Sequence, residues 1–247
     1  MRLSKKDIIK TTSIICITIL IFYIFNTLKS KSLANTNVNS DLFPKYIVSG
    51  VLKYNTNYLK QGEKVTVLWS SHNQFYFISD SDNRKIKIPW GSLYIEEDTK
   101  PYPPDATEEE IECFINSQEV ISGTDYLLWT DLSRLKTYAF RRSDNNWELI
   151  KTMKCSAGDK HHPTPTGTFE ILYNPPFIGT EYNYVCKNAL VFYRGFMYHS
   201  VPFEWNSKNV IDDRIGYRIS NGCIRLSVED SLWVYNNIPI GSAVFIR

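Results

Sequence analysis

The sequence predicts a mainly β protein, in which a small barrel of five short strands is followed by a β-rich sandwich with a few short helices. Aromatic residues make up 14% of the 247 residues, including 16 Tyr and 6 Trp. Short runs rich in Val, Ile, Thr and Tyr recur along the chain, with turn-forming residues between them. With 43% apolar residues, the chain is large enough for one medium domain and one small domain.

The first 29 residues predict a membrane anchor. Residues 1–10 carry four basic side chains and one acid, and residues 11–28 form an 18-residue stretch without a charge. As a helix this stretch would span about 27 Å, close to the hydrocarbon thickness of a bilayer. Because the larger basic cluster comes first, we expect a single-pass protein of the cell membrane whose catalytic region lies on the extracellular, cell-wall side.

Two other interpretations of this segment are open. Ser32-Leu33-Ala34 fits the small-x-small rule for signal-peptide cleavage, although it lies far beyond the most apolar part at 14–25. A buried helix of a soluble domain is the third interpretation, and the all-round apolar pattern behind a basic head argues against it. The sequence leaves open whether the segment is cleaved.

A linker of residues 30–41 leads to the first folded region, residues 42–98. The linker is polar and lacks periodicity. In the region that follows, residues 85–90 alternate with a period of two, as expected for a half-buried strand. The five strands are expected at 46–54, 64–69, 75–78, 85–90 and in the Pro-Trp-Gly-Ser-Leu-Tyr-Ile element at 89–95.

Residues 99–121 are predicted as a second linker and a helix. A proline-rich break at 99–105 comes first. Thr107 is the expected N-cap and Glu110 its capping-box partner, with further acidic residues at the positive end of the helix dipole. The helix should bury Ile111, Phe114 and Ile115 and end near residues 116–117.

Residues 122–247 are predicted as one domain, a sandwich of consecutive antiparallel strands. The strands are expected at 126–130, 135–140, 147–153, 169–173, 189–193, 196–198 and 243–246. A short helix at 227–235 should have Ser227 as its N-cap, with Glu229 and Asp230 in its first turn.

The main candidate for chemistry is Cys223 in the run Ser220-Asn221-Gly222-Cys223-Ile224-Arg225. A thiolate is the strongest side-chain nucleophile near neutral pH, and it needs a base or a lowered pKa to form. His199, 24 positions upstream, is the candidate base, and the following helix would favour the thiolate. The amides of Gly222 and Cys223 are candidates for an oxyanion site, and Arg225 suits a carboxylate. On these grounds alone, a core or disulfide cysteine is the commoner explanation.

Two signatures resemble the L,D-transpeptidase catalytic domain, the YkuD-like family. The first is Pro163-Thr164-Pro165-Thr166-Gly167-Thr168-Phe169. The second is Tyr198-His199-Ser200, followed by the cysteine run and by residues 229–241. The resemblance covers about residues 122–247. Many family members carry His where this chain has Asn221, and others place a different polar residue there. Residues 42–98 resemble a bacterial SH3-like barrel more weakly.

The resemblance implies a role for each site residue. Cys223 would be the nucleophile, His199 the base, and the backbone carbonyl of Ser200 the group that orients the imidazole. Arg225 would contact a carboxylate or carbonyl of the substrate, and an ion pair with Glu229 or Asp230 is its structural alternative. The other substrate-binding candidates are Ser220, Asn221, Gly222 and Tyr198.

The implied activity is cysteine-dependent acyl transfer on peptidoglycan stem peptides. Cys223 would attack the carbonyl after the L-centre of diaminopimelate in a tetrapeptide, releasing D-alanine, and the amine of a second stem peptide would complete a 3→3 cross-link. Water as the acceptor would give L,D-carboxypeptidase activity instead. The alternative function is a membrane-tethered cell-wall-binding module with an inactive catalytic domain. It would dock through Trp69, Tyr76 and Trp90, unless these rings pack in the core. A cysteine peptidase acting on protein lacks the spacing of papain-like enzymes.

Composition and residue spacing restrict the partners. A net charge of +2, from 28 basic and 26 acidic residues, argues against nucleic acid. The spacing of Cys and His, including adjacent His161 and His162, predicts no metal, and we expect no cofactor and a monomer. Four cysteines after the anchor leave disulfides open, such as Cys155 with Cys186, whereas the motif favours a free thiol at Cys223.

Overall fold

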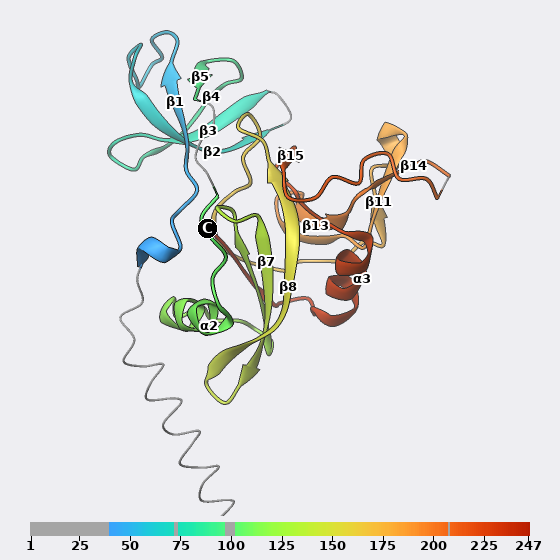
Figure 1. Cartoon of the computed structure of the whole chain (residues 1–247). Coiled ribbons are helices and arrows are strands. Elements are labelled where there is room, and N and C mark those ends of the chain that lie inside the picture. Colours follow the sequence, from blue (N-terminus) through green and yellow to red (C-terminus); the bar gives the residue numbers. More distant parts are fainter. Residues whose placement is uncertain (1–39, 72–73, 97–101, 207) are drawn as a thin grey trace, which may run out of the picture. The chain divides into compact units, whose positions relative to one another are not determined.

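The computed structural model describes residues 40–71, 74–96, 102–206 and 208–247 (Figure 1). Strands dominate these residues, which confirms the predicted mainly β class. Short 3-10 turns lie at Ser40–Leu42 and Thr180–Tyr182.

The prediction of a single-pass membrane protein is corrected. In the part of the chain that the structure describes, none of the helices is long and apolar enough to cross a membrane. The predicted anchor at 1–29 and most of the linker at 30–41 lie outside the described residues.

The first folded region is a five-stranded antiparallel sheet in the order β4-β3-β2-β1-β5. Its strands are β1 (Val48–Leu52), β2 (Lys64–Ser71), β3 (Phe75–Ser79), β4 (Lys85–Pro89) and β5 (Leu93–Ile95). Alternate residues of each strand point inward because side chains alternate along an extended backbone, and they form one apolar cluster that includes Val65, Tyr76 and Ile78. All five predicted strands are present, and the SH3-like comparison stays a prediction.

Helix α2 (Glu108–Ser117) begins as its sequence predicts. The Thr107 hydroxyl accepts a hydrogen bond from the Glu110 amide, and the Glu110 carboxylate accepts one from the Thr107 amide at 2.7 Å. The helix buries Ile111, Phe114 and Ile115, as predicted, together with Cys113. Phe114 packs against the ring of Trp129 with 4.7 Å between ring centroids.

The second region is a nine-stranded sheet in the order β12-β13-β16-β8-β7-β6-β17-β9, with β15 paired to β8. Figure 1 shows the long β8 beside β7. The strands are β6 (Tyr126–Asp131), β7 (Lys136–Ser143), β8 (Asn146–Gly158), β9 (Gly167–Glu170), β12 (Leu190–Tyr193), β13 (Phe196–Ser200), β15 (Arg218–Ser220), β16 (Ile224–Leu226) and β17 (Ala243–Ile246). Helix α3 (Val228–Asn237) has Ser227 as its N-cap, as predicted.

The pairing of these strands differs from the predicted run of consecutive antiparallel neighbours. Strands β6 and β17, β13 and β16, and β8 and β15 pair in parallel. A further antiparallel sheet, not predicted, joins β10 (Phe177–Ile178), β11 (Tyr184–Lys187) and β14 (Pro202–Glu204). Parallel pairs join segments far apart in the sequence, so the local pattern of apolar residues does not reveal them.

The capping box of α2 gives a test of local stability. Thr107→Ala should lower the free energy of unfolding by about 1 kcal/mol, because it leaves an amide of the first helical turn without its acceptor. Glu110→Ala should also destabilise, and the double variant should lose less than the sum of the two, because both changes remove the hydrogen bond that the Thr107 hydroxyl donates to the Glu110 carboxylate at 3.0 Å. Urea unfolding of the three variants measures this, and strict additivity would argue against a reciprocal box.

Candidate active site

The parallel pairing of β13 with β16 brings the two halves of the predicted site together. His199 lies opposite Arg225, and Tyr198 opposite Ile224. Cys223 comes one residue before β16, and its sulfur accepts a hydrogen bond from the backbone amide of Met197. Neighbours in a sheet point to the same face and successive residues alternate, so Cys223, Arg225 and His199 share one face. Strand spacing and rise separate the Cα atoms of His199 and Cys223 by roughly 8 Å, a span that these side chains can bridge.

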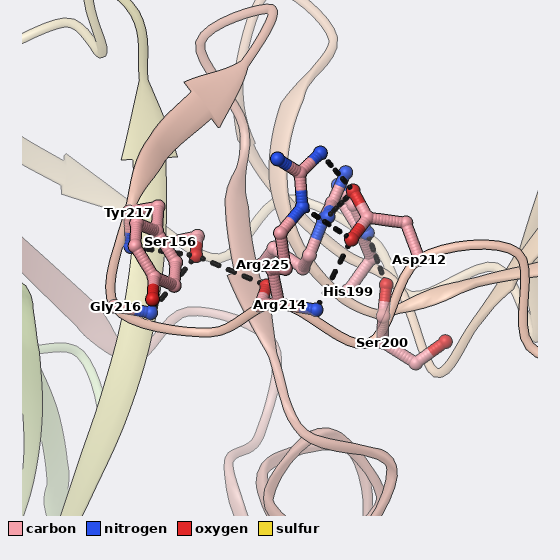
Figure 2. A network of polar contacts seen from close by, with 8 residues as sticks. All are labelled: Ser156, His199, Ser200, Asp212, Arg214, Gly216, Tyr217 and Arg225. Carbon is pink, nitrogen blue, oxygen red and sulfur yellow. Dashed lines mark hydrogen bonds and ion pairs between the residues drawn. The ribbon is translucent and has the colours of Figure 1, made fainter.

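His199 is a buried imidazole whose proton position is fixed by its neighbour. Its Nδ1 lies 2.7 Å from the backbone oxygen of Ser200 (Figure 2). A carbonyl only accepts, so Nδ1 carries the proton and Nε2 is left as the acceptor. Burial lowers the pKa of His199 to about 4 against the opposing effect of the Ser200 carbonyl, and the charge of Arg225 lowers it further. The imidazole is therefore neutral near pH 7.

Cys223 carries a free thiol that is partly exposed. Its Sγ lies 3.9 Å from the carbonyl oxygen of Gly195. Burial of the sulfur raises the pKa of the thiol to about 11, although the hydrogen bond with Met197 acts in the opposite direction. The expectation that the following helix favours the thiolate is wrong: β16 separates Cys223 from α3, and a helix dipole acts mainly within its own first turn.

The loop before Cys223 is held by Ser220 and by close packing of two glycines. The Ser220 hydroxyl donates to the Cys223 carbonyl at 2.6 Å and accepts from the Gly222 amide at 3.2 Å. The Gly222 amide, predicted to face an oxyanion, therefore already has a partner. Gly222 has φ +102°, and a Cβ there would lie 2.4 Å from a ring carbon of Phe196. Asn221 is exposed at the tip of the loop.

The Pro-Thr-Pro signature contacts the end of β8 that packs against the cysteine loop. The Thr164 hydroxyl accepts from the Gly158 amide at 2.9 Å, at the end of β8. A Cβ at Gly158 would lie 2.9 Å from the Cα of Gly222 and 2.0 Å from the carbonyl oxygen of His162. The two sequence signatures therefore meet in space at the cysteine loop.

Arg225 forms an ion pair with a residue that the sequence analysis missed. Its Nη1 lies 2.8 Å from a carboxylate oxygen of Asp212, which also binds Arg214 at 2.8 Å (Figure 2). The two guanidinium groups hold the pKa of the Asp212 carboxyl well below its usual range, against the effect of partial burial. Of the two predicted alternatives, Asp230 pairs with Lys151 instead. Asp212 lies in a polar stretch without periodicity, so no local signal marked it.

The segment that carries Asp212 is fastened to β8 by one buried hydroxyl. The Ser156 Oγ accepts from the amides of Gly216 and Tyr217 at 3.0 and 3.1 Å, and donates to the Arg214 carbonyl at 3.4 Å (Figure 2). These bonds hold the acidic residue in place over Arg225.

Tyr198 and Ser200 are both buried, and only Ser200 contacts His199, through its carbonyl as predicted. Tyr198 does not bind substrate: its ring is fully buried and its hydroxyl bonds Thr130 at 2.8 Å, because it points to the core side of β13. The Ser200 side chain is also buried and accepts from the Lys187 amide at 2.8 Å, which links β13 to β11. It is the Ser200 carbonyl that faces His199.

The cysteines and histidines of the described residues show no other assembled centre. Cys155 and Cys186 are buried free thiols, so the disulfide considered between them is absent, and Cys113 is also buried. No set of three His, Cys, Asp or Glu side chains within the described ranges is placed to hold a metal ion. The Nδ1 of His162 lies 3.0 Å from Asp159, and that of His161 lies 3.5 Å from the Tyr76 hydroxyl.

Comparison with known proteins agrees with this arrangement. Residues 125–246 match the family model of the YkuD L,D-transpeptidase catalytic domain. Bacillus subtilis (strain 168) YciB, which carries an L,D-transpeptidase name, is 33% identical over 132 residues, covering 48% of this chain and 65% of YciB. L,D-transpeptidase 1 of Mycobacterium tuberculosis is 28% identical over 114 residues, covering 40% of this chain and 43% of that protein.

Solved structures are also similar to the chain. A Clostridium acetobutylicum structure described as a fused Zn-dependent amidase/peptidase/peptidoglycan-binding domain-containing protein has a TM-score of 0.49 and 28% identity, covering 57% of this chain and 59% of that one. A structure of the LD transpeptidase LdtMt1 in complex with imipenem has a TM-score of 0.41 and 19% identity, covering 51% of this chain and 60% of that one.

The buried imidazole of His199 gives a test by pH. An unfolded His binds a proton near pH 6.5, whereas folded His199 binds one only near pH 4, so acid favours unfolding across this window. The free energy of unfolding should fall by at most about 3 kcal/mol between these two pH values through this residue. Urea unfolding at a series of pH values should show that His199→Asn lacks this part of the slope. Equal slopes in both proteins would contradict a depressed pKa.

The neutral thiol gives a second test. The rate of Cys223 alkylation by iodoacetamide should rise about tenfold for each pH unit from about pH 7 to about pH 10, because only the thiolate reacts. Mass spectrometry of the labelled peptide follows the rate, with Cys223→Ala as the control for labelling of the buried cysteines. A plateau below about pH 8 would instead indicate a resting thiolate–imidazolium pair.

Proposed function

We propose that this chain is a peptidoglycan L,D-transpeptidase that acts through an acyl-enzyme on Cys223. The observation that carries the proposal is the β13–β16 pairing, which sets Cys223 and His199 on one face of the sheet. The Ser200 carbonyl fixes the tautomer that leaves Nε2 of His199 free to accept the thiol proton. The match of residues 125–246 to the YkuD L,D-transpeptidase catalytic domain supports the reaction class.

The Cys223 thiol and the His199 imidazole are both neutral at rest, which determines when the proton would move in the first step. A thiol with a pKa of about 11 and an imidazole with a pKa of about 4 do not form a resting ion pair. The proton therefore passes from Sγ to Nε2 as sulfur attacks the carbonyl that follows the L-centre of diaminopimelate. His199 then gives this proton to the amine of the departing D-alanine, which leaves a thioester on Cys223.

The second step would regenerate the thiol. The side-chain amine of a second stem peptide attacks the thioester carbonyl and gives its proton to His199, and the sulfur takes the proton back as it leaves. The product is a 3→3 cross-link. Water in place of the amine gives the tripeptide, which is L,D-carboxypeptidase activity.

The structure gives little support to the alternative function, a cell-wall-binding module that docks through Trp69, Tyr76 and Trp90. Tyr76 is buried, and the ring of Trp90 lies 4.9 Å from that of His162. The ring of Trp69 lies 5.8 Å from that of Phe196. These three side chains pack against the loops around the cysteine instead of forming a separate exposed surface.

The direct test is product analysis with a disaccharide-tetrapeptide. The protein should release D-alanine and form a 3→3 cross-linked dimer, or release D-alanine with tripeptide if water is the acceptor. Cys223→Ala should abolish both products and leave the thermal unfolding temperature close to that of the unaltered protein.

Acylation by a carbapenem provides an independent check. Intact-mass spectrometry should show a single adduct on the unaltered protein and none on Cys223→Ala. Absence of both adduct and D-alanine release, under conditions that label an active L,D-transpeptidase, would contradict the proposed function.

A further inference from the structure

The turn between β12 and β13 carries an exposed cation, Arg194, directly before a residue whose backbone contacts the nucleophile. Tyr193 pairs with Phe196, so Arg194 and Gly195 form a two-residue turn, with φ of +43° and +89°. Glycine and asparagine are preferred at such positions, and arginine is uncommon there. The carbonyl oxygen of Gly195 is the group that lies 3.9 Å from the Cys223 Sγ. Arg194 thus occupies an unusual backbone position. It directly precedes Gly195, whose carbonyl oxygen contacts the reacting sulfur.

The guanidinium of Arg194 is held by two aromatic rings. Its Cζ lies 5.6 Å from the ring centroid of Tyr193 and 5.7 Å from that of Trp69, within range of a cation–π contact. Trp69 belongs to β2 of the five-stranded sheet, and Phe77 stacks on it at 3.8 Å. The first folded region therefore supplies part of the support for a side chain of the active-site rim.

Accessibility and charge distinguish Arg194 from the arginine named by the sequence motif. Arg225 is 11% exposed in its side chain and already binds the Asp212 carboxylate. Arg194 is exposed, and no acidic side chain pairs with it in the part of the chain that the structure describes. Arg194 is therefore available to a carboxylate that arrives from solvent, whereas Arg225 already has an acidic partner.

We propose that Arg194 binds the C-terminal carboxylate of the donor peptide, and that it thereby sets a preference for free-acid over amidated donors. The proposal rests on the proposed function. In the donor, this carboxylate lies three bonds beyond the carbonyl carbon that Cys223 attacks, so it must lie near the sulfur. A guanidinium matches a carboxylate with two parallel hydrogen bonds. Arg194 is thus a specificity-determining residue, and Trp69 is the residue that positions it.

The test compares two donors, the disaccharide-tetrapeptide and its C-terminal amide. Arg194→Gln should lower kcat/KM for the acid about tenfold, mainly through KM, as expected for one charge-assisted contact at an open site. The unaltered protein should lose a similar factor on the amide, and Arg194→Gln should cause little further loss there. Arg194→Lys should keep part of the preference, because it keeps the charge and loses the fork.

Two further variants separate this role from a structural one. Arg142 is also exposed and lies over a tryptophan, 4.6 Å from the ring of Trp147, so Arg142→Gln is the matched control and should change neither donor. Trp69→Leu should reduce the preference for the acid, because it removes one of the two rings beside the Arg194 guanidinium. Iodoacetamide is neutral, and burial and Met197 set the pKa of the Cys223 thiol, so Arg194→Gln should leave the rate of Cys223 alkylation by iodoacetamide unchanged.

The possible outcomes separate this inference from the proposed function. The role of Arg194 would be overturned if Arg194→Gln lost kcat/KM equally on the acid and amide donors, or lost none, while the unaltered protein still released D-alanine. A loss that instead depended on amidation of the diaminopimelate carboxylate would overturn the assignment to the C-terminal group. If the unaltered protein released no D-alanine or D-alaninamide and took up no carbapenem, the proposed function itself would fail.

Discussion

The parallel contact between β13 and β16 is the constraint on which the candidate site depends. It aligns His199 with Arg225 and sets Cys223 diagonally across from the imidazole. The same pairing sends Tyr198, Ile224 and Leu226 into the core, where all three are fully buried. Because side chains alternate along a strand, the apolar residues that anchor this pair also determine which polar residues face the other way. A shift of one residue in either strand would bury the reactive groups and expose the core.

The surroundings of this pair hold both reactive groups in their neutral forms. Burial raises the pKa of the Cys223 thiol and lowers that of His199, so charge develops only when a substrate is attacked. The loop before the sulfur tolerates little change, because Gly222 lies against Phe196 and Gly158 against Gly222. The Pro-Thr-Pro signature contributes through packing and one hydrogen bond from the Gly158 amide. Its role in the site is structural.

Two arginines of this region serve different purposes. Arg225 secures the segment around Asp212, which the Ser156 hydroxyl also fastens to β8. Arg194 lies in the solvent-facing turn next to Gly195, supported by an aromatic ring from the first region. The cysteine motif in the sequence indicates Arg225 but not Arg194. The role of Arg194 is indicated only by the contact between Trp69 of β2 and the turn after β12.

The sequence by itself determined the elements whose signals are local. The capping box of Thr107 and Glu110, the N-cap at Ser227 and the five strands of the first sheet depend on neighbouring residues, and each lies where its pattern predicted. The cysteine and histidine motifs also marked the domain that matches the YkuD family. Only the tertiary structure decided the parallel strand pairs, the burial of Tyr198, the Asp212 partner of Arg225 and the place of Arg194. These depend on contacts between residues far apart in the chain, and no periodicity within one segment carries that information.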